Sequence, residues 1–346
     1  MPRTTLALLC AACCVPAIPA LALDETRPDV TAFVAEMAAK HGFDAAELSR
    51  TLALVESRPP IIEAISRPAE KVMPWHEYRA RFLTERRIRR GAEVSRAEAD
   101  ALGRAAALGV PAQVMLAIVG VETFYGENVG KHRVADALAT LAFDYPPRSP
   151  FFRSELENYL LMAREESLDP LVPVGSYAGA MGIPQFMPSS FRNFAVDGDG
   201  DGHRNLWKSW PDVFASVANY LKKHGWRAGE PIMSPADVSA ANLEGLEFGK
   251  LDLRETVGSL RARGVRLDTV LPDDAPAVLV RLIGVDGPEY RVGYRNFHAI
   301  TRYNRSQLYA SAVNDLAEAI AAEAMIAAGP PRTEPRPFES VSTPGP

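Results

Sequence analysis

The chain has 346 residues, of which 47% are hydrophobic and 23% are charged. This composition is typical of a globular protein with one enlarged domain or two domains, and it excludes disorder throughout. The 38 Lys and Arg residues against 43 Asp and Glu residues give a formal charge of −5. Because this balance leaves no basic field for a phosphate backbone, we expect no nucleic-acid partner.

The chain begins with an apolar run over residues 6–23. It contains Ala20-Leu21-Ala22, which fits the small-x-small cleavage pattern of a secretory signal. We therefore expect a signal peptide over residues 1–22 and export to the periplasm. An uncleaved membrane anchor is the alternative, but Pro16 and Pro19 break the run, and a spanning helix needs about 20 residues. We expect no transmembrane segment in the mature chain.

All three cysteines lie inside this segment, at Cys10, Cys13 and Cys14. Cleavage would leave a protein without thiols or disulfides, which excludes redox chemistry and thiolate metal sites. Lipid attachment at Cys13 is a minority alternative, because Cys10 stands where lipoprotein signals usually carry Leu.

Helical periodicity dominates the next part of the chain. Val30, Phe33 and Met37 recur at helical spacing, and similar patterns follow as far as about residue 107. We expect an N-terminal helical subdomain over residues 23–110, completed by a helix over 306–328.

Residues 111–230 are predicted to form an all-helical core. Pro111 suits the first turn of a helix whose apolar face continues to Val121 and which ends at Glu122. Further helices are expected at 134–142, 151–166, 189–195 and 212–224.

The pattern changes after Gly229. Residues 277–283 and 290–294 are predicted strands around the turn Asp286-Gly287-Pro288, within a small β subdomain over residues 231–305 that returns to the core. Residues 329–346 contain six prolines and no core-forming pattern, so we expect a disordered tail.

An acidic loop carries the first functional signal. Asp197, Asp199 and Asp201 occupy positions one, three and five of an EF-hand-like loop. Gly202 at position six permits a sharp turn, which would direct the backbone carbonyl of His203 inward. Three carboxylates within five residues repel one another unless a cation compensates them, so we expect bound calcium.

The loop departs from the standard pattern at position twelve, where Lys208 replaces the usual Glu. Asp212, at the start of the next helix, is the candidate for the closing ligand, giving a longer loop over residues 197–212. An exposed acidic turn without metal is the alternative. We expect calcium to be structural and expect no organic cofactor.

Glu122 is the second signal, because it is a lone acid at the end of an apolar helix. Burial disfavours its ionised form and raises its pKa, as a general acid working near neutral pH requires. The signal is weak alone, since a glutamate near a helix end is more often exposed or paired.

Residues 174–190 give the third signal. Their small residues allow a ligand to approach the backbone, and Ser176 and Gln185 offer neutral hydrogen bonds. The motifs V-E-[TS]-x-[FY]-G, S-[YF]-A-G-A-x-G-x-x-Q-F-M-P-S-S, D-x-D-G-D-G, A-N-Y-L and T-R-Y-N occur in this order. Together they resemble the B-type lytic murein transglycosylases, from about Asp29 to Ala328.

The resemblance implies an α+β, predominantly α fold: a lysozyme-like catalytic core with an added helical subdomain, a small β subdomain and the EF-hand-like loop. It implies a lytic transglycosylase that cleaves the β-1,4 bond between N-acetylmuramic acid and N-acetylglucosamine. Its catalytic acid falls on Glu122, which would protonate the glycosidic oxygen and then deprotonate the C6 hydroxyl, leaving a 1,6-anhydro end. Ordinary glycosidases need two carboxylates, and Asp144 and Glu127 stay open as partner acids.

The resemblance assigns Ser176 and Gln185 to the substrate groove, with Ser176 near the N-acetyl group. Arg148 falls where the family often carries two arginines, although Pro147 precedes it here. The remaining cleft positions implied by the family are Tyr78, Tyr220, Tyr303, Asn304 and Tyr309. Tyrosine rings can cover sugar faces, but core packing is an equal alternative for each.

The expected partners are peptidoglycan glycan strands, bound by a monomer. Three other functions stay open: a true hydrolase (muramidase) of the same bond, a non-catalytic peptidoglycan-binding protein, and a calcium sensor. The retained Glu122 argues against the binding protein, and the single calcium loop argues against the sensor.

Overall fold

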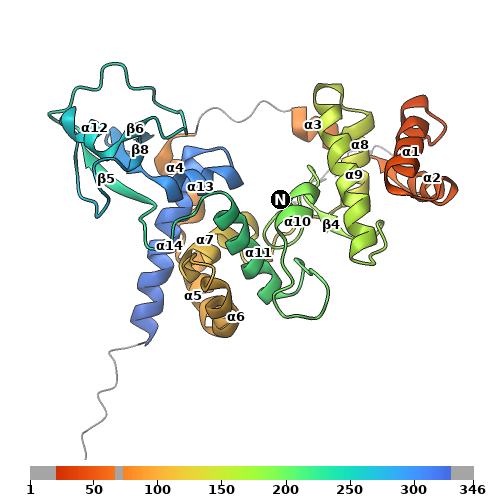
Figure 1. The fold of residues 1–346 in the computed structure, drawn as a ribbon, viewed down its shortest axis with the longest axis horizontal. Helices are drawn as coiled ribbons and strands as arrows, with labels where there is room; N and C mark the ends of the chain where they lie inside the picture. Colours follow the sequence, from red (N-terminus) through yellow and green to blue (C-terminus); the bar gives the residue numbers. More distant parts are fainter. Residues whose placement is uncertain (1–20, 67–72, 329–346) are drawn as a thin grey trace, which may run out of the picture. The chain divides into compact units, whose positions relative to one another are not determined.

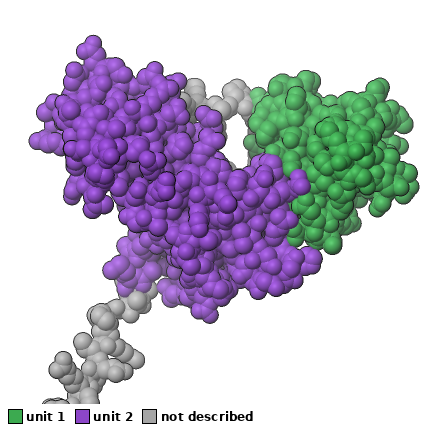
Figure 2. Space-filling model, in the orientation of Figure 1, with its two compact units in different colours: residues 1–68, 131–179 green, residues 69–130, 180–346 purple. Residues whose placement is uncertain are grey.

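The fold is described from a computed structural model, which covers residues 21–66 and 73–328 (Figure 1). Most of the predicted signal peptide and the whole Pro-rich tail lie outside the described residues. The chain divides into two compact units, shown in green and purple in Figure 2. Unit 1 comprises residues 1–68 and 131–179, and unit 2 comprises residues 69–130 and 180–346.

Unit 1 is mainly helical. Its elements are β1 (Leu21–Ala22), α1 (Pro28–His41), α2 (Ala45–Ala53), β2 (Glu56–Ser57), α3 (Pro59–Ser66), β3 (His132–Arg133), α8 (Val134–Phe143), the 3-10 helix η1 (Pro146–Arg148), α9 (Ser149–Glu165) and β4 (Val174–Gly175). Helix α1 buries Val30, Phe33 and Met37, which confirms the helical pattern of the sequence, and it ends at Gly42 with φ of 66°.

Helix α8 is buried along its whole length. It carries one acid, Asp136, which is 1% exposed. The Asp136 carboxylate accepts hydrogen bonds from the Arg133 guanidinium (2.9 Å), the Arg58 guanidinium (3.2 Å) and the Glu56 backbone N–H (3.0 Å). A buried charge needs such pairing, so this cluster fixes β2 and β3 against α8.

Unit 2 contains the remaining helices and the main sheet. Its helices are α4 (Trp75–Phe82), α5 (Glu85–Ala97), α6 (Ala99–Ala106), α7 (Ala112–Thr123), α10 (Pro188–Phe194), α11 (Trp210–Lys223), α12 (Val257–Ala262), α13 (Arg295–Tyr303) and α14 (Gln307–Ala328). Helix α14 packs against α4, α5 and α7. The residues of α7 from 114 to 121 are buried, as its apolar sequence predicts.

The sheet of unit 2 has the strand order β6-β8-β9-β5-β7, and each adjacent pair is antiparallel. Its strands are β5 (Met233–Asp237), β6 (Glu255–Thr256), β7 (Arg266–Leu267), β8 (Pro276–Ile283) and β9 (Pro288–Gly293). Leu279, Val292 and Leu260 contribute to the hydrophobic core that α12 forms with this sheet.

The predicted helices after residue 110 and both predicted strands are present, with ends shifted by at most two residues. The strands β5, β6 and β7 and the helices α12 and α13 were not predicted from the sequence. The Pro and Asp residues of β5 disfavour a strand. The units also differ from the predicted subdomains, because α1–α3 lie in unit 1 and α4–α6 in unit 2. Hydrophobic periodicity identifies helices but not which helices pack together, so the subdomain boundaries stay predictions.

Candidate active site and cation loop

Glu122 is the second-last residue of α7, in unit 2. The residue is half-buried, but its carboxyl group is surrounded by protein, and this desolvation raises its pKa to about 7. The hydroxyl of Tyr309, on α14, donates a hydrogen bond of 2.7 Å to Glu122 Oε1. This bond favours the carboxylate and opposes the effect of burial, without cancelling it.

Two further tyrosines lie within electrostatic reach of Glu122. Burial raises the pKa of Tyr78 to about 12, with a smaller contribution from the Glu122 charge. Burial and the Glu122 charge also hold the pKa of Tyr303 well above its usual value. The Tyr303 and Tyr309 rings are nearly parallel, with centroids 6.5 Å apart. Three phenols that stay protonated therefore adjoin the buried acid.

The backbone after Glu122 takes an unusual path. Phe124, Tyr125 and Gly126 have successive φ angles of 53°, 57° and 90°, in the left-handed region that non-glycine residues rarely adopt. Tyr125 folds back onto its own helix, because a Cβ atom placed at Gly120 would lie 2.7 Å from the Tyr125 hydroxyl. The same hydroxyl would lie 2.4 Å from a Cβ atom at Gly91. Two helical glycines thus make the slot that holds this turn.

Hydrogen bonds fix the rest of the turn. The Thr123 hydroxyl donates to the Ile183 carbonyl at 2.8 Å, and the Tyr125 hydroxyl donates to the Arg87 carbonyl at 3.1 Å. The Gln185 side-chain amide donates to the carbonyls of Val129 (3.1 Å) and Gly182 (2.9 Å). The motif around Gln185 therefore supports the segment that follows the acid.

Two other predicted cleft residues of unit 2 have different surroundings. Tyr220 is 7% exposed, and its hydroxyl donates to the Arg302 carbonyl at 2.6 Å. Its ring packs among aromatic rings, including that of Tyr303 at 4.8 Å, which favours the packing alternative. Asn304 is exposed at the end of α13.

Ser176 and Arg148 belong to unit 1. Ser176 follows β4 and is half-buried, and its carbonyl accepts a hydrogen bond from the Gly179 N–H at 3.0 Å. The Arg148 guanidinium lies over the ring of Phe151, 4.5 Å from its centroid. Their roles toward a substrate stay predictions.

The two candidate partner acids are engaged elsewhere. Asp144, in unit 1, pairs with Arg27 at 2.5 Å and accepts a hydrogen bond from the Ser57 hydroxyl at 2.6 Å. Glu127 pairs with Arg86 at 2.8 Å. These contacts agree with structural roles for both acids and leave Glu122 as the candidate acid with a raised pKa.

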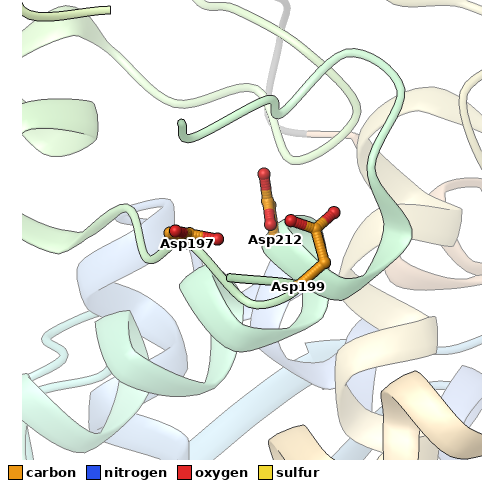
Figure 3. Close-up of side chains that lie close together, drawn as sticks. All are labelled: Asp197, Asp199 and Asp212. Carbon is orange, nitrogen blue, oxygen red and sulfur yellow. The ribbon is translucent and has the colours of Figure 1, made fainter. Parts of the chain in front are cut away.

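The acidic loop brings three carboxylates together (Figure 3). One oxygen each from Asp197, Asp199 and Asp212 lies within 4.8 Å of the others. Desolvation and the nearby Asp199 charge raise the pKa of Asp212. Carboxylates gathered in this way fit a hard cation such as calcium, whose ligands are oxygens.

Backbone N–H groups shape the loop. Asp212 accepts hydrogen bonds from Gly198 (2.8 Å) and Asn205 (2.6 Å), which ties the start of α11 to the loop. Asp201 lies outside the group of three carboxylates, and it accepts a hydrogen bond from the His203 N–H at 2.8 Å. The structure thus brings Asp212 beside Asp197 and Asp199, as the sequence spacing led us to expect. The role of all five residues as calcium ligands stays a prediction.

Thr123 and Tyr125, which hold the turn after Glu122, were not predicted from the sequence. Isolated glycines within helical patterns, here Gly91 and Gly120, signal a close approach of another group and could have pointed to the Tyr125 slot.

Comparisons with known proteins identify the family. The model of the transglycosylase SLT domain matches residues 25–318. The chain belongs to this transglycosylase family. It is 41% identical over 304 residues to membrane-bound lytic murein transglycosylase B of Escherichia coli K12, covering 85% of this chain and 83% of that protein.

Solved structures of lytic transglycosylases are similar to this chain in both sequence and fold. The catenated lytic transglycosylase SltB1 of Pseudomonas aeruginosa is 49% identical, with a TM-score of 0.84 over 87% of this chain and 99% of that one. The lytic transglycosylase Slt35 of Escherichia coli, solved in complex with calcium, is 39% identical, with a TM-score of 0.80 over 88% of this chain and 96% of that one. The predicted α+β, lysozyme-like fold is therefore confirmed.

Within residues 21–66 and 73–328 of this transglycosylase, the helices are all too short or too polar to cross a membrane.

Proposed function

We propose that this protein is a lytic transglycosylase of peptidoglycan in which Glu122 acts first as the general acid and then as the general base. The observation that carries the proposal is the surroundings of Glu122, which raise its pKa to about 7. A carboxyl group that stays protonated near neutral pH can donate to a leaving group. The similarity to lytic murein transglycosylase B supports the choice of substrate.

In the first step, Glu122 transfers its proton to the glycosidic oxygen between N-acetylmuramic acid and N-acetylglucosamine. The bond from C1 to this oxygen breaks, and the electron pair leaves with the oxygen. Positive charge then develops at C1, and the new Glu122 carboxylate keeps the hydrogen bond from Tyr309.

In the second step, the carboxylate removes the proton from the C6 hydroxyl of the same muramyl residue. Oxygen O6 bonds to C1, which closes the 1,6-anhydro ring and restores the Glu122 acid. No water is consumed, so a single carboxyl group serves both steps, in contrast to the pair of acids in ordinary glycosidases.

The tyrosines near Glu122 have two roles in this proposal. Tyr309 orients the carboxyl group and stabilises its ionised form, while Tyr78 and Tyr303 limit water around it. Gln185 acts through the backbone of residues 129 and 182. Ser176 is proposed to bind the N-acetyl group of the muramyl residue, and Arg148 and Asn304 to contact the outer parts of the substrate.

We also propose that calcium occupies the loop over residues 197–212, with Asp197, Asp199, Asp201, the His203 carbonyl and Asp212 as ligands. The cation would supply the positive charge that three adjacent carboxylates need. Calcium in the Slt35 structure supports this assignment. The role is structural, since Asp212 begins the helix that carries Tyr220.

The remaining parts of the proposal concern the cellular setting. The signal-like segment over residues 1–22 would export the chain to the periplasm, where peptidoglycan strands lie. There the mature protein would act as a monomer.

The test is digestion of purified peptidoglycan by the wild-type protein and by Glu122→Gln, with product masses read by mass spectrometry. We expect anhydro ends that are one water lighter than hydrolysed ends, and a loss of rate of at least about 10³-fold in the variant, within the range for a general acid–base residue. Asp144→Asn and Glu127→Gln serve as matched controls and should stay within about tenfold of wild type.

Hydrolysed ends would support the muramidase alternative instead. Retained activity in Glu122→Gln would refute the role of this residue, and an inactive wild-type protein that still binds peptidoglycan would favour a binding protein.

A further inference from the structure

A cavity of about 980 Å³ opens in unit 2, between one face of the sheet and the helices α4 and α14. Strands β5 and β9 line one side through residues 233–239 and 288–291. The other side is lined by Arg79 of α4 and by Asn314, Asp315, Glu318 and Ala319 of α14. The volume lies within the usual range for ligand sites, about 300–1,000 Å³.

The two strands separate along this cavity. Pairing between β5 and β9 ends at Pro235 opposite Arg291, and β5 then pairs with β7 from Ala236 onward. Pro235 has no backbone N–H to continue the ladder. Within the described residues, the edge of β9 over 288–290 that faces β5 has no paired strand. An extended peptide can add to such an edge through its main-chain hydrogen bonds.

The guanidinium of Arg79 lies at the same cavity and is held in place by Asp315. The Asp315 side chain is 8% exposed and pairs with Arg291 and Arg79. Arg79 uses only its Nε for this contact, at 3.0 Å, and its side chain is 49% exposed. Its two terminal amino groups have no partner within the described residues. Asp315 therefore holds a guanidinium in place with free donors, the geometry that binds a carboxylate.

Two acids at the cavity have no cationic partner within the described residues. Glu318 accepts a hydrogen bond only from the Asn314 amide, at 3.0 Å, and Glu289 is exposed on β9. Asp237, by contrast, pairs with Arg266. The cavity thus offers the guanidinium of Arg79 and the carboxylates of Glu289 and Glu318. These groups complement a ligand that carries charges of both signs.

This cavity is separate from the Glu122 site. Tyr309 of α14 contacts Glu122, whereas Asn314, Asp315 and Glu318 of the same helix line the cavity. At 3.6 residues per turn, positions 314, 315 and 318 lie 120–180° around the helix from position 309. Both sites can therefore be occupied at once.

We propose that this cavity binds a short peptide with a free carboxylate and a free ammonium group. The carboxylate pairs with Arg79, the ammonium lies near Glu289 and Glu318, and the peptide backbone follows β9. The proposal rests on the proposed function only for the source of the ligand, the peptide stems of peptidoglycan. Such a site would hold a stem while the glycan is cleaved elsewhere on the molecule.

The test uses the full mature chain carrying Glu122→Gln, titrated with peptide stems that an amidase releases from purified peptidoglycan. We expect saturable binding by calorimetry, unaffected by an excess of chitooligosaccharide. Acetylation of the stem amino groups, or Glu289→Gln combined with Glu318→Gln, should weaken binding about tenfold or more, because each removes a charge-assisted contact. Glu244→Gln, an exposed acid outside the cavity, is the matched control and should bind as the parent does.

Three results would overturn the proposal: no stem binding at millimolar concentration, equal binding of acetylated stems, or parent-like binding by the double variant. Competition by chitooligosaccharide would show that the stems bind at the Glu122 site, and this result would also overturn the proposal. These outcomes are independent of the proposed function, which is tested by the anhydro ends that the wild-type protein forms and by the loss of activity in Glu122→Gln. Thermal melts of the double variant check that it is folded.

Discussion

Unit 2 holds carboxyl groups in two opposite environments. Among the described residues, Glu122 has one hydrogen-bond donor, Tyr309, and burial raises its pKa to about 7. In the acidic loop, Asp197 is surrounded by backbone N–H donors, and its pKa is lowered, chiefly by the hydrogen bond from Gly202. A carboxyl group thus serves as a proton donor at Glu122 and as an anion at Asp197. The difference lies in the number of hydrogen-bond donors around each group and in how deeply it is buried.

The acidic loop gives the largest expected effect on stability. Removal of calcium by a chelator should lower the free energy of unfolding by about 2–3 kcal/mol when the calcium concentration is about 100 times its dissociation constant. The melting temperature should fall by several degrees, as differential scanning calorimetry would record.

Asp212→Asn should abolish this calcium dependence, while Asp274→Asn, an exposed acid elsewhere in unit 2, should keep it. The chemical step should be unchanged in the folded enzyme that survives chelation. An unchanged melting temperature in chelator would count against a structural cation in the acidic loop.

Gly120→Ala tests the support of Glu122. The new methyl group would lie 2.7 Å from the Tyr125 hydroxyl, so the ring or the helix must shift. We expect a loss of about 1–3 kcal/mol in the free energy of unfolding, measured in urea, together with reduced activity.

The matched control is Gly103→Ala in α6, where an added Cβ meets nothing within 4 Å. This change should stabilise the protein by up to about 1 kcal/mol, since alanine favours a helix. Equal stability of the two variants would contradict the tight slot around Tyr125.

Tyr309→Phe should produce the smallest effect and tests the hydrogen bond that Tyr309 donates to Glu122. The hydrogen bond favours the carboxylate, so its loss should raise the pKa of Glu122 further. Because the reaction begins from the protonated acid, the alkaline limb of kcat/KM should move to higher pH by about one unit. We expect kcat to fall less than tenfold.

Tyr159→Phe removes a tyrosine hydrogen bond to the Pro170 carbonyl in unit 1. This variant is the matched control for the measurement and should leave the profile unchanged. A shift of the Tyr309→Phe profile to lower pH would show that the phenol stabilises the neutral acid instead.

The sequence predicted the acidic loop more completely than the surroundings of Glu122. The spacing of Asp197 and Asp199 is local, so it identified the loop directly, and the Asp at 212 followed from the missing Glu at position twelve. Glu122 was found from its apolar helix, but Tyr309 is 187 residues away, and its contact depends on the packing of α14 against α7. The family resemblance placed Tyr309 in the cleft without giving its partner.

The same limit applied to the fold. Periodicity located most helices because it reports the burial of one face. It did not reveal the five-stranded sheet, whose strand β5 contains Pro235 and Asp237, nor the division of the chain into two units. The sheet and the division into units both depend on contacts between residues far apart in the sequence. Such contacts leave no periodic signal in the sequence.

The proposed chemistry depends on the raised pKa of Glu122. Infrared difference spectra of wild type minus Glu122→Gln, recorded from pH 3 to pH 9, would follow the carbonyl band of this one protonated carboxyl group. We expect a band that disappears with a midpoint near pH 7. A midpoint near 4.5, the ordinary value for glutamate, would contradict it.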